Sequence, residues 1–159
     1  MIRVQEQDFD IGAEIAALTA GQTAIGGVAT FTGLVRDMAP VAGSDRPISA
    51  MTLEHYPGMT ETKLAEIEAE ANRRWPLDAS LIIHRYGRLE PGDRIVLVAC
   101  ASAHRQAAFD ACQFLMDWLK TDAPFWKLED TDAGKVWVET RDSDAAAAAR
   151  WKEQAEQTK

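Results

Sequence analysis

The sequence has no long apolar run and few cysteines, and both absences narrow the possible classes of protein. No hydrophobic stretch approaches the ~18 residues of a membrane span, and residues 1–10 lack the apolar core of a signal peptide. Cys100 and Cys112 lie in apolar stretches. We therefore expect two reduced, buried thiols in a cytoplasmic protein, with a disulfide or a metal pair as the alternative.

Basic residues are also scarce relative to acidic ones. The chain has 17 Lys and Arg against 25 Asp and Glu, a formal net charge of -8. This balance argues against non-specific binding to nucleic acids or to anionic membranes. An anionic ligand would therefore need a local concentration of Arg, Lys and His side chains.

Three common catalytic patterns are missing from the sequence. It contains no Ser-His-Asp order around a nucleophile elbow, no Gly-rich phosphate loop and no Cys/His spacing typical of a metal site. The length of 159 residues fits one domain, residues 1–159, with a sizeable core.

The hydrophobic periodicity predicts alternating strands and helices with several hairpins. Strands are expected at residues 2–6, 24–36, 50–56, 80–88, 94–102, 125–130 and 135–140, and helices at 11–19, 60–75, 104–120 and 144–159. Glycines in the 24–36 strand indicate a bulge or a close backbone approach, and the apolar 94–102 strand is expected at the sheet centre. Residues 37–49 form a long polar loop, and the last helix is expected to fray. This order indicates an α+β fold with a mixed or antiparallel sheet and flanking helices.

The helix that begins at His104 is the element around which the rest is organised. Its apolar residues recur at helical spacing, Ser102 can cap its start, Thr60 can cap the preceding helix, and Pro124 stops its continuation. His104 and Lys120 are sixteen residues apart, which corresponds to roughly 24 Å along a helix. No small substrate reaches both from one copy, so there are either two sites or one site built from two subunits. We favour the second interpretation.

Each basic candidate has a structural alternative. A lysine at a helix C-terminus, as at Lys120, often serves the helix dipole and solubility. Lys127 is typical of a lysine in a strand whose aliphatic part is buried while its ammonium reaches solvent. Arg36 ends a strand that is mostly buried by its sequence pattern, and its alternative is an arginine at the strand edge in solvent. His55 and His84, both in strands, are expected to be hydrogen-bonded structural histidines.

The sequence resembles the large, catalytic subunit of molybdopterin synthase, the MoaE family. The matching segments are FTGLVR (31–36), LEHYPGMTE (53–61), HRYGRLEPGD (84–93), SAHRQAAF (102–109) and MDWLKTDAPFWKLE (116–129). They occur in the family's order and cover most of residues 25–141. The N-terminal region and residues 37–49 depart from the family pattern, and nothing is carried over for them.

The resemblance implies an α/β hammerhead fold and a sulfur-transfer reaction without a cofactor or metal. Family members convert cyclic pyranopterin monophosphate (precursor Z) to molybdopterin, with sulfur from the thiocarboxylated Gly-Gly tail of a small ubiquitin-like partner. Two large subunits form a dimer within a heterotetramer. The motif match implies Lys120 and Lys127 as catalytic residues. It implies substrate binding by Leu34, Val35, Arg36, His104, Arg105, Leu128 and Glu129, and, on the WVETR stretch, by Arg141.

Two other functions remain open at this point. The first is a non-catalytic adaptor that binds the tail of a ubiquitin-like protein in the same pocket. The second is a stand-alone domain that binds a phosphorylated ligand. The His104-Arg105 pair favours the enzyme over the adaptor, because docking of a protein tail would not need a phosphate anchor.

Overall fold

A computed structural model of the protein describes residues 1–36, 50–121, 123–131, 134–138 and 151. Within residues 127–131 and 134–138 the description covers the backbone and its pairing. The helices of the described chain are α1 (Ile11–Thr19), α2 (Met59–Arg74) and α3 (Arg105–Thr121). The strands are β1 (Ile2–Gln5), β2 (Gly27–Leu34), β3 (Ala50–His55), β4 (Ala79–Arg85), β5 (Gly87–Leu89), β6 (Arg94–Ser102), β7 (Phe125–Thr131) and β8 (Gly134–Val138). The prediction of an α+β fold is confirmed.

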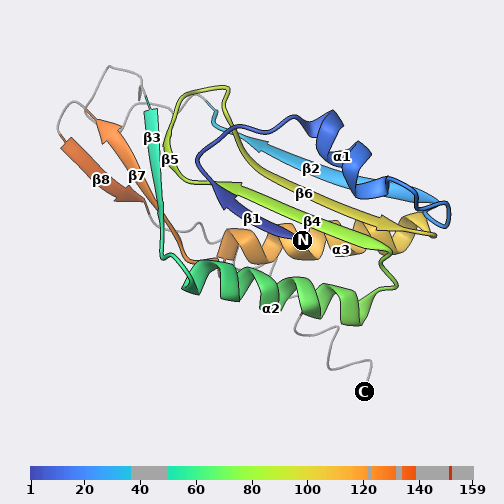
Figure 1. The fold of residues 1–159 in the computed structure, drawn as a ribbon. Helices are drawn as coiled ribbons and strands as arrows, with labels where there is room; N and C mark the ends of the chain where they lie inside the picture. The colour runs from blue at the N-terminus through green and yellow to red at the C-terminus, as the bar shows by residue number, and fades with distance from the viewer. Residues whose placement is uncertain (37–49, 122, 132–133, 139–150, 152–159) are drawn as a thin grey trace.

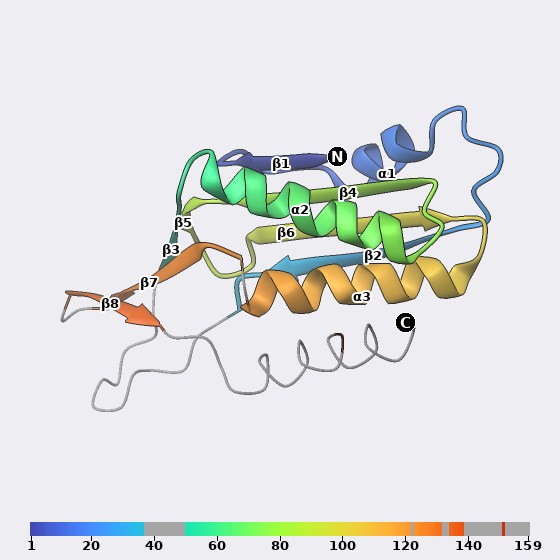
Figure 2. The ribbon, with the colours of Figure 1, turned by 90° about the horizontal axis from the view of Figure 1, so that it is seen from below.

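The first sheet contains four strands in the order β1-β4-β6-β2. β1 pairs with β4 in parallel, and β4 and β2 each pair with β6 antiparallel. The apolar strand β6 lies inside the sheet, as predicted. Helix α1 lies on one face of the sheet, and α2 and α3 lie on the other (Figures 1 and 2).

Successive side chains along each strand point to opposite faces of the sheet. Leu81 and Ile83 of β4 pack with the α1 layer, whereas Ile82 between them packs with the α2 and α3 layer. Because both faces are covered, β4 and β6 are apolar almost throughout.

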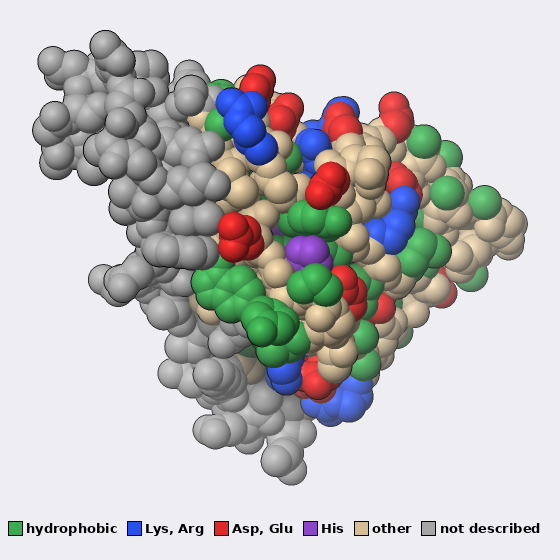
Figure 3. Space-filling view, turned by 60° about the vertical axis from the view of Figure 1, so that its left-hand side comes forward, with side chains coloured by type: hydrophobic (Ala, Val, Ile, Leu, Met, Phe, Trp, Pro, Cys, Tyr) green, Lys and Arg blue, Asp and Glu red, His purple; other side chains and the backbone are tan. Residues whose placement is uncertain are grey.

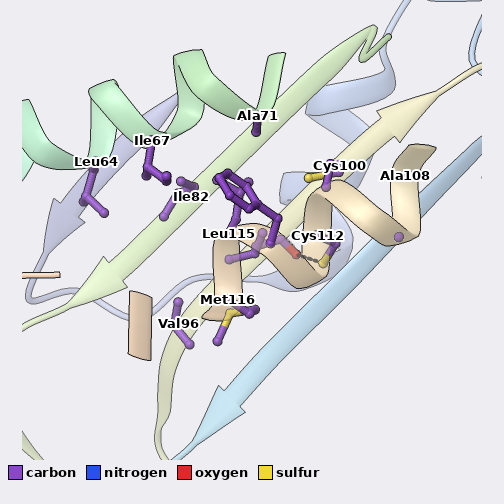
Figure 4. Packing of buried hydrophobic residues seen from close by; sticks show 14 of the residues in the cluster. Leu64, Ile67, Ala71, Ile82, Val96, Cys100, Ala108, Cys112, Leu115 and Met116 are labelled. Atoms are coloured by element: carbon purple, nitrogen blue, oxygen red, sulfur yellow. Dashed lines mark hydrogen bonds between the residues drawn. The ribbon is translucent and has the colours of Figure 1, made fainter. Parts of the chain in front are cut away.

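The larger core lies between the sheet and helices α2 and α3. Figure 4 shows residues of α2, such as Leu64 and Ile67, pointing toward the sheet beside Leu115 of α3. Cys100 and Cys112 lie in this core as free, buried thiols, which confirms that prediction, and the Cys112 thiol contacts the Val98 carbonyl oxygen at 3.9 Å. The predicted apolar face of α3 is buried as well.

The second sheet has the order β5-β3-β7-β8 and is antiparallel throughout. The prediction of a single strand over residues 80–88 is wrong, because the chain breaks into β4 and β5 and these belong to different sheets. Gly87 has φ +86°, a backbone conformation that L side chains rarely adopt, and the chain turns there from one sheet to the other. The predicted hairpin of the two last strands is confirmed.

Strand β2 differs from its prediction in burial. The predicted bulge is confirmed by a register shift between Gly33 and Leu34. However, β2 is an edge strand in the described sheet and only Ala29 within it is fully buried, so the expectation that Arg36 ends a mostly buried strand is wrong. The sequence pattern is misleading here because β-branched residues suit edge and central strands alike.

The start of α2 also differs from its prediction. Thr60 is not the cap, because the helix begins one residue earlier at Met59 and the Glu61 carboxylate accepts a hydrogen bond from the Gly58 N–H at 2.6 Å. Thr60 instead lies inside the first turn with a fully buried side chain.

No helix in the described part of the chain is both long and apolar enough to cross a membrane. The C-terminal helix predicted at residues 144–159 lies outside the described residues, except for the helical, buried Trp151.

Candidate functional site

The start of α3 presents His104 and Arg105, both exposed, beside the start of β2. The Ser102 hydroxyl, at the end of β6, accepts a hydrogen bond from the His104 N–H at 3.2 Å and donates one to the Pro76 carbonyl at 2.8 Å. The His104 carbonyl then accepts from the Ala108 N–H at 3.4 Å, which opens the helical ladder. Ser102 therefore orders the residue before the helix, close to its predicted capping role.

A close backbone approach fixes this end of the helix. The Gly26 N–H donates to the Ser102 carbonyl at 3.1 Å, and a Cβ atom added at Gly26 would lie 2.2 Å from the Ala103 carbonyl oxygen. Only a residue without a side chain fits at this position. The glycine pattern in the sequence predicted such an approach, and it involves Ala103, the residue before His104.

The other end of α3 presents Lys120, exposed in the last helical turn. The ends of α3 and β2 lie on the same side of the molecule, toward the second sheet (Figures 1 and 2). Leu34 and Arg36 at the end of β2 are exposed there. The structure therefore brings Lys120 toward the predicted β2 residues and leaves His104 and Arg105 at the opposite end.

Val35 is placed differently from its two neighbours. Its side chain is buried in a small cluster with Met51, Leu53 and Leu89. Its N–H donates to the Asp93 carbonyl at 2.8 Å, and its carbonyl accepts from the Gly92 N–H at 2.7 Å. A contact between Val35 and substrate stays a prediction, and within this chain its side chain serves packing.

The remaining predicted residues lie on or beyond β7. Lys127 pairs with Leu53 of β3 and Val138 of β8, so it lies in an inner strand of the second sheet. Leu128 and Glu129 follow in the same ladder, and Arg141 lies outside the described residues. Six residues lie between Lys120 and Lys127 in the chain.

The predicted cations differ from the other basic residues in their pairing. Arg3, Arg73, Arg74, Arg85, Arg88 and Arg94 each lie within salt-bridge distance of a carboxylate. Within the described part of the chain, the Arg36, His104, Arg105 and Lys120 side chains make no hydrogen bond or ion pair. Cations without an internal partner are available for an external anion.

A cluster of aromatic rings and histidines lies behind Lys120, and sequence reasoning assigned it no role in the site. The His84 ring stacks on Phe125 with ring centroids 3.7 Å apart and planes at 16°. His55 lies 4.3 Å from the Tyr86 ring, and its Nε2 is 3.7 Å from Glu61 Oε1. Figure 3 shows hydrophobic side chains gathered around a histidine on this side of the molecule. No local sequence pattern signals the contact between His84 and Phe125, because it depends on how the two sheets meet.

Burial keeps His84 neutral at physiological pH. The residue is 9% exposed, and its Nδ1 lies 2.9 Å from the Arg85 carbonyl oxygen, which confirms the prediction of a buried, hydrogen-bonded histidine. Loss of hydration lowers the pKa of His84 to about 4, and the nearby positive charge of Lys120 lowers it further.

No group of three or more metal-ligating side chains occurs among the described residues. The described residues of the site, Arg36, His104, Arg105 and Lys120, offer cations and hydrogen-bond donors to an anion. Such groups can bind a phosphate and can stabilise developing negative charge.

The comparisons with known proteins agree with the geometry. The family model of the MoaE protein matches residues 4–122. The chain is 60% identical over 152 residues to the molybdopterin synthase catalytic subunit of Pseudomonas aeruginosa, covering 96% of this chain and 99% of that protein. Its structure resembles the molybdopterin biosynthesis MoaE protein of Burkholderia ambifaria, with a TM-score of 0.80, 52% identity, and coverage of 96% of this chain and 97% of that one.

A more distant structure shares the fold. The molybdopterin synthase of Staphylococcus aureus aligns with a TM-score of 0.76 and 29% identity, covering 86% of this chain and 96% of that one. The resemblance predicted from the sequence motifs is thus confirmed over nearly the whole length. The chain belongs to the MoaE protein family.

Proposed function

We propose that this chain is the catalytic subunit of a molybdopterin synthase. It converts cyclic pyranopterin monophosphate to molybdopterin, taking sulfur from the C-terminal thiocarboxylate of a small ubiquitin-like subunit. Relatives that match nearly the whole chain are molybdopterin synthase catalytic subunits, which supports this function. One structural observation carries the proposal: within the described part of the chain, the predicted site residues Arg36, His104, Arg105 and Lys120 are basic side chains without an internal partner, in a protein whose net charge is -8.

The site is assembled from two copies of the chain. In a single copy, the 17-residue helix α3 separates His104 and Arg105 from Lys120 by roughly 24 Å. A phosphorylated pterin cannot span that distance. The start of one α3 must therefore meet the end of another.

The edge strand β2 offers a surface for such a dimer. β2 pairs only with β6 in the described sheet, and its large side chains Phe31 and Leu34 are 43% and 55% exposed. Phe109 of the neighbouring α3 is 60% exposed. α3 runs parallel to β2, because both are antiparallel to β6. A two-fold axis through the middle of β2 would set two copies of α3 antiparallel and bring His104 of one copy toward Lys120 of the other.

The residues have distinct proposed roles. Arg36, His104 and Arg105 hold the substrate phosphate, with Arg141 beside them, since arginine and the start of a helix both favour phosphate. Lys120 and Lys127 donate protons and stabilise negative charge at the attacked carbon and the thiocarboxylate. Leu34, Val35, Leu128 and Glu129 complete the substrate-binding site.

The decisive experiment combines the purified chain, a thiocarboxylated small subunit and the pterin monophosphate. We expect dithiolene pterin from the native chain and a loss of about a hundredfold or more with Lys120→Ala. Lys63→Ala is the matched control, because Lys63 is an exposed lysine paired with Glu66 on α2, and it should leave the rate unchanged. Product from neither the native chain nor the control would leave the adaptor function in place of the enzyme.

A mixing experiment tests the shared site. Lys120→Ala and His104→Ala chains are each expected to be inactive, but a mixed dimer contains one intact site. Random exchange of the two should restore about a quarter of native activity, because half the dimers are mixed and each has one working site. No recovery in demonstrably mixed dimers would contradict a site built from two chains.

Two further expectations belong to this proposal. The chain acts in the cytoplasm, which is supported by two free, buried cysteines. Residues 1–159 form one domain, which is supported by the family match and by the packing of Trp151 against Trp75 and Phe114 of the main core.

A further inference from the structure

The two sheets of the molecule touch through a pair of stacked rings. His84 belongs to β4 of the first sheet, and Phe125 is the first residue of β7 in the second sheet. Their centroids lie 3.7 Å apart with the planes at 16°. Phe125 also packs against the main core and lies 6.4 Å from the His55 ring. This stack is therefore a joint between the sheets.

The His84 ring is fixed on its other side as well. Because a carbonyl oxygen only accepts hydrogen bonds, the 2.9 Å contact to the Arg85 carbonyl places the proton on Nδ1. The stacking partner and the hydrogen bond together define the position and plane of the ring. A ring held in this way fixes the position of the Phe125 ring that stacks on it.

The chain between α3 and β7 is tied down at this joint. The Thr60 hydroxyl, fully buried, donates to the Pro124 carbonyl at 3.3 Å and accepts from the Tyr56 N–H at 3.1 Å. The Phe125 N–H donates to the Ala123 carbonyl at 2.8 Å. Lys120 lies three residues before Ala123, and Lys127 lies two residues after Phe125.

We propose that His84 is a positioning residue for sulfur transfer: its ring, stacked on Phe125, fixes where β7 leaves the end of α3 and so sets Lys120 relative to the strand that carries Lys127. The inference rests on the proposed function for its catalytic consequence. His84 does not touch substrate in this role. It acts through Phe125 on the spacing of two residues from different elements, and displacements near 1 Å at such residues reduce catalytic rates strongly.

Three variants of the full chain, assayed with the thiocarboxylated small subunit, test the proposal. His84→Ala removes the ring. His84→Phe keeps a flat ring for the stack and removes the hydrogen bond to Arg85. Leu81→Ala is the matched control, because Leu81 is a buried residue of the same strand that faces the α1 layer, away from Phe125.

The expected result is a split between kinetic parameters. His84→Ala should lower kcat about tenfold or more and change KM for the pterin less than about threefold, since substrate anchors are intact and lysine placement is not. His84→Phe should retain kcat within about threefold of native. Assays are run at a temperature where all variants are folded. Equal losses of kcat in His84→Ala and Leu81→Ala, or an equal loss in His84→Phe, would overturn the proposal.

A second readout does not depend on turnover. Hydrogen exchange of the peptide containing Phe125 should accelerate in His84→Ala and stay near native in His84→Phe and Leu81→Ala. Unchanged exchange in His84→Ala overturns the positioning role even if the native chain proves inactive. An inactive native chain with accelerated exchange in His84→Ala contradicts the proposed function and supports the joint itself.

Discussion

The two ends of α3 carry the predicted site residues, but the molecule holds them in different ways. The start is held mainly by the backbone: Gly26 lies against Ala103, and Ser102 bridges Pro76 and His104. The end is held mainly by side chains that join two sheets, namely His84, Phe125 and Thr60. A close contact between backbone atoms tolerates almost no substitution, whereas contacts between side chains can be weakened one at a time by single substitutions. The two ends should therefore respond differently to mutation and to pH.

The largest effect is expected at the start of the helix. Gly26→Ala should destabilise the protein by more than about 3 kcal/mol, because its Cβ would approach the Ala103 carbonyl oxygen to 2.2 Å and the backbone would have to shift. Urea unfolding measures the change. Gly27→Ala is the control, since its Cβ would meet nothing within 4 Å, and it should change stability by less than about 0.5 kcal/mol. Similar values for the two variants would mean that this close backbone contact is absent.

The next effect is the pH dependence at the other end. The pKa of His84 is about 4 in the folded protein, lowered first by burial and also by Lys120 and His55, against an ordinary value of 6.5. The unfolded chain therefore binds a proton between pH 6.5 and 4 that the folded chain does not. Stability is fully present above pH 6.5 and decreases as the pH falls, by up to about 3 kcal/mol near pH 4.

His84→Phe isolates this contribution. Its unfolding free energy should vary much less than that of the native protein between pH 6.5 and 4.5. The window ends there because the carboxyl groups of Asp8 and Glu70, whose pKa values are lowered to about 2 mainly by hydrogen bonds from Arg94 and Arg73, contribute at lower pH. Parallel pH profiles of native and His84→Phe proteins would contradict a neutral, buried His84.

The smallest expected effect compares the buried hydroxyl of Thr60 with the exposed hydroxyl of Thr62. Thr60→Val leaves the Tyr56 N–H without its hydroxyl partner and removes the donor to Pro124, so a loss of about 1–2 kcal/mol is expected by thermal unfolding. Thr62→Val is the control, because its hydroxyl bonds only the exposed Gly58 carbonyl, and it should cost less than about 0.5 kcal/mol.

Ser102→Ala makes the same kind of change at the start of α3. It should cost a similar amount of stability to Thr60→Val, because the Ser102 hydroxyl is also buried and bridges two backbone groups. If activity falls with Thr60→Val and with Ser102→Ala alike, both ends of α3 contribute to one reaction. A loss in only one variant would separate them.

The sequence predicted local structure well where the signal was periodic and near in the chain. The helix Ile11–Thr19 matches its predicted bounds, and the apolar face of α3 and the β7–β8 hairpin appear as expected. The ends of α3 were correctly singled out as exposed and basic. In each case a pattern of a few neighbouring residues is enough to decide the structure.

The errors came from contacts between distant segments. The division of residues 80–88 between two sheets depends on the pairing of β5 with β3, and the edge position of β2 depends on which strand lies beyond it. Thr60 suits a helix cap in sequence, but its hydroxyl is used by a turn 64 residues away. The stack of His84 on Phe125 likewise has no local signal.

At Gly87 the chain passes through a short, rigid connection between the two sheets. Only Tyr86 lies between Arg85, the last residue of β4, and Gly87, the first residue of β5, so the chain passes from one sheet to the other through a very short connection. A residue with a Cβ atom at position 87 would strain the backbone and change the angle between the two sheets. The angle between the two sheets, and with it the placement of β7 relative to α3, thus depends on the backbone conformation of a single glycine.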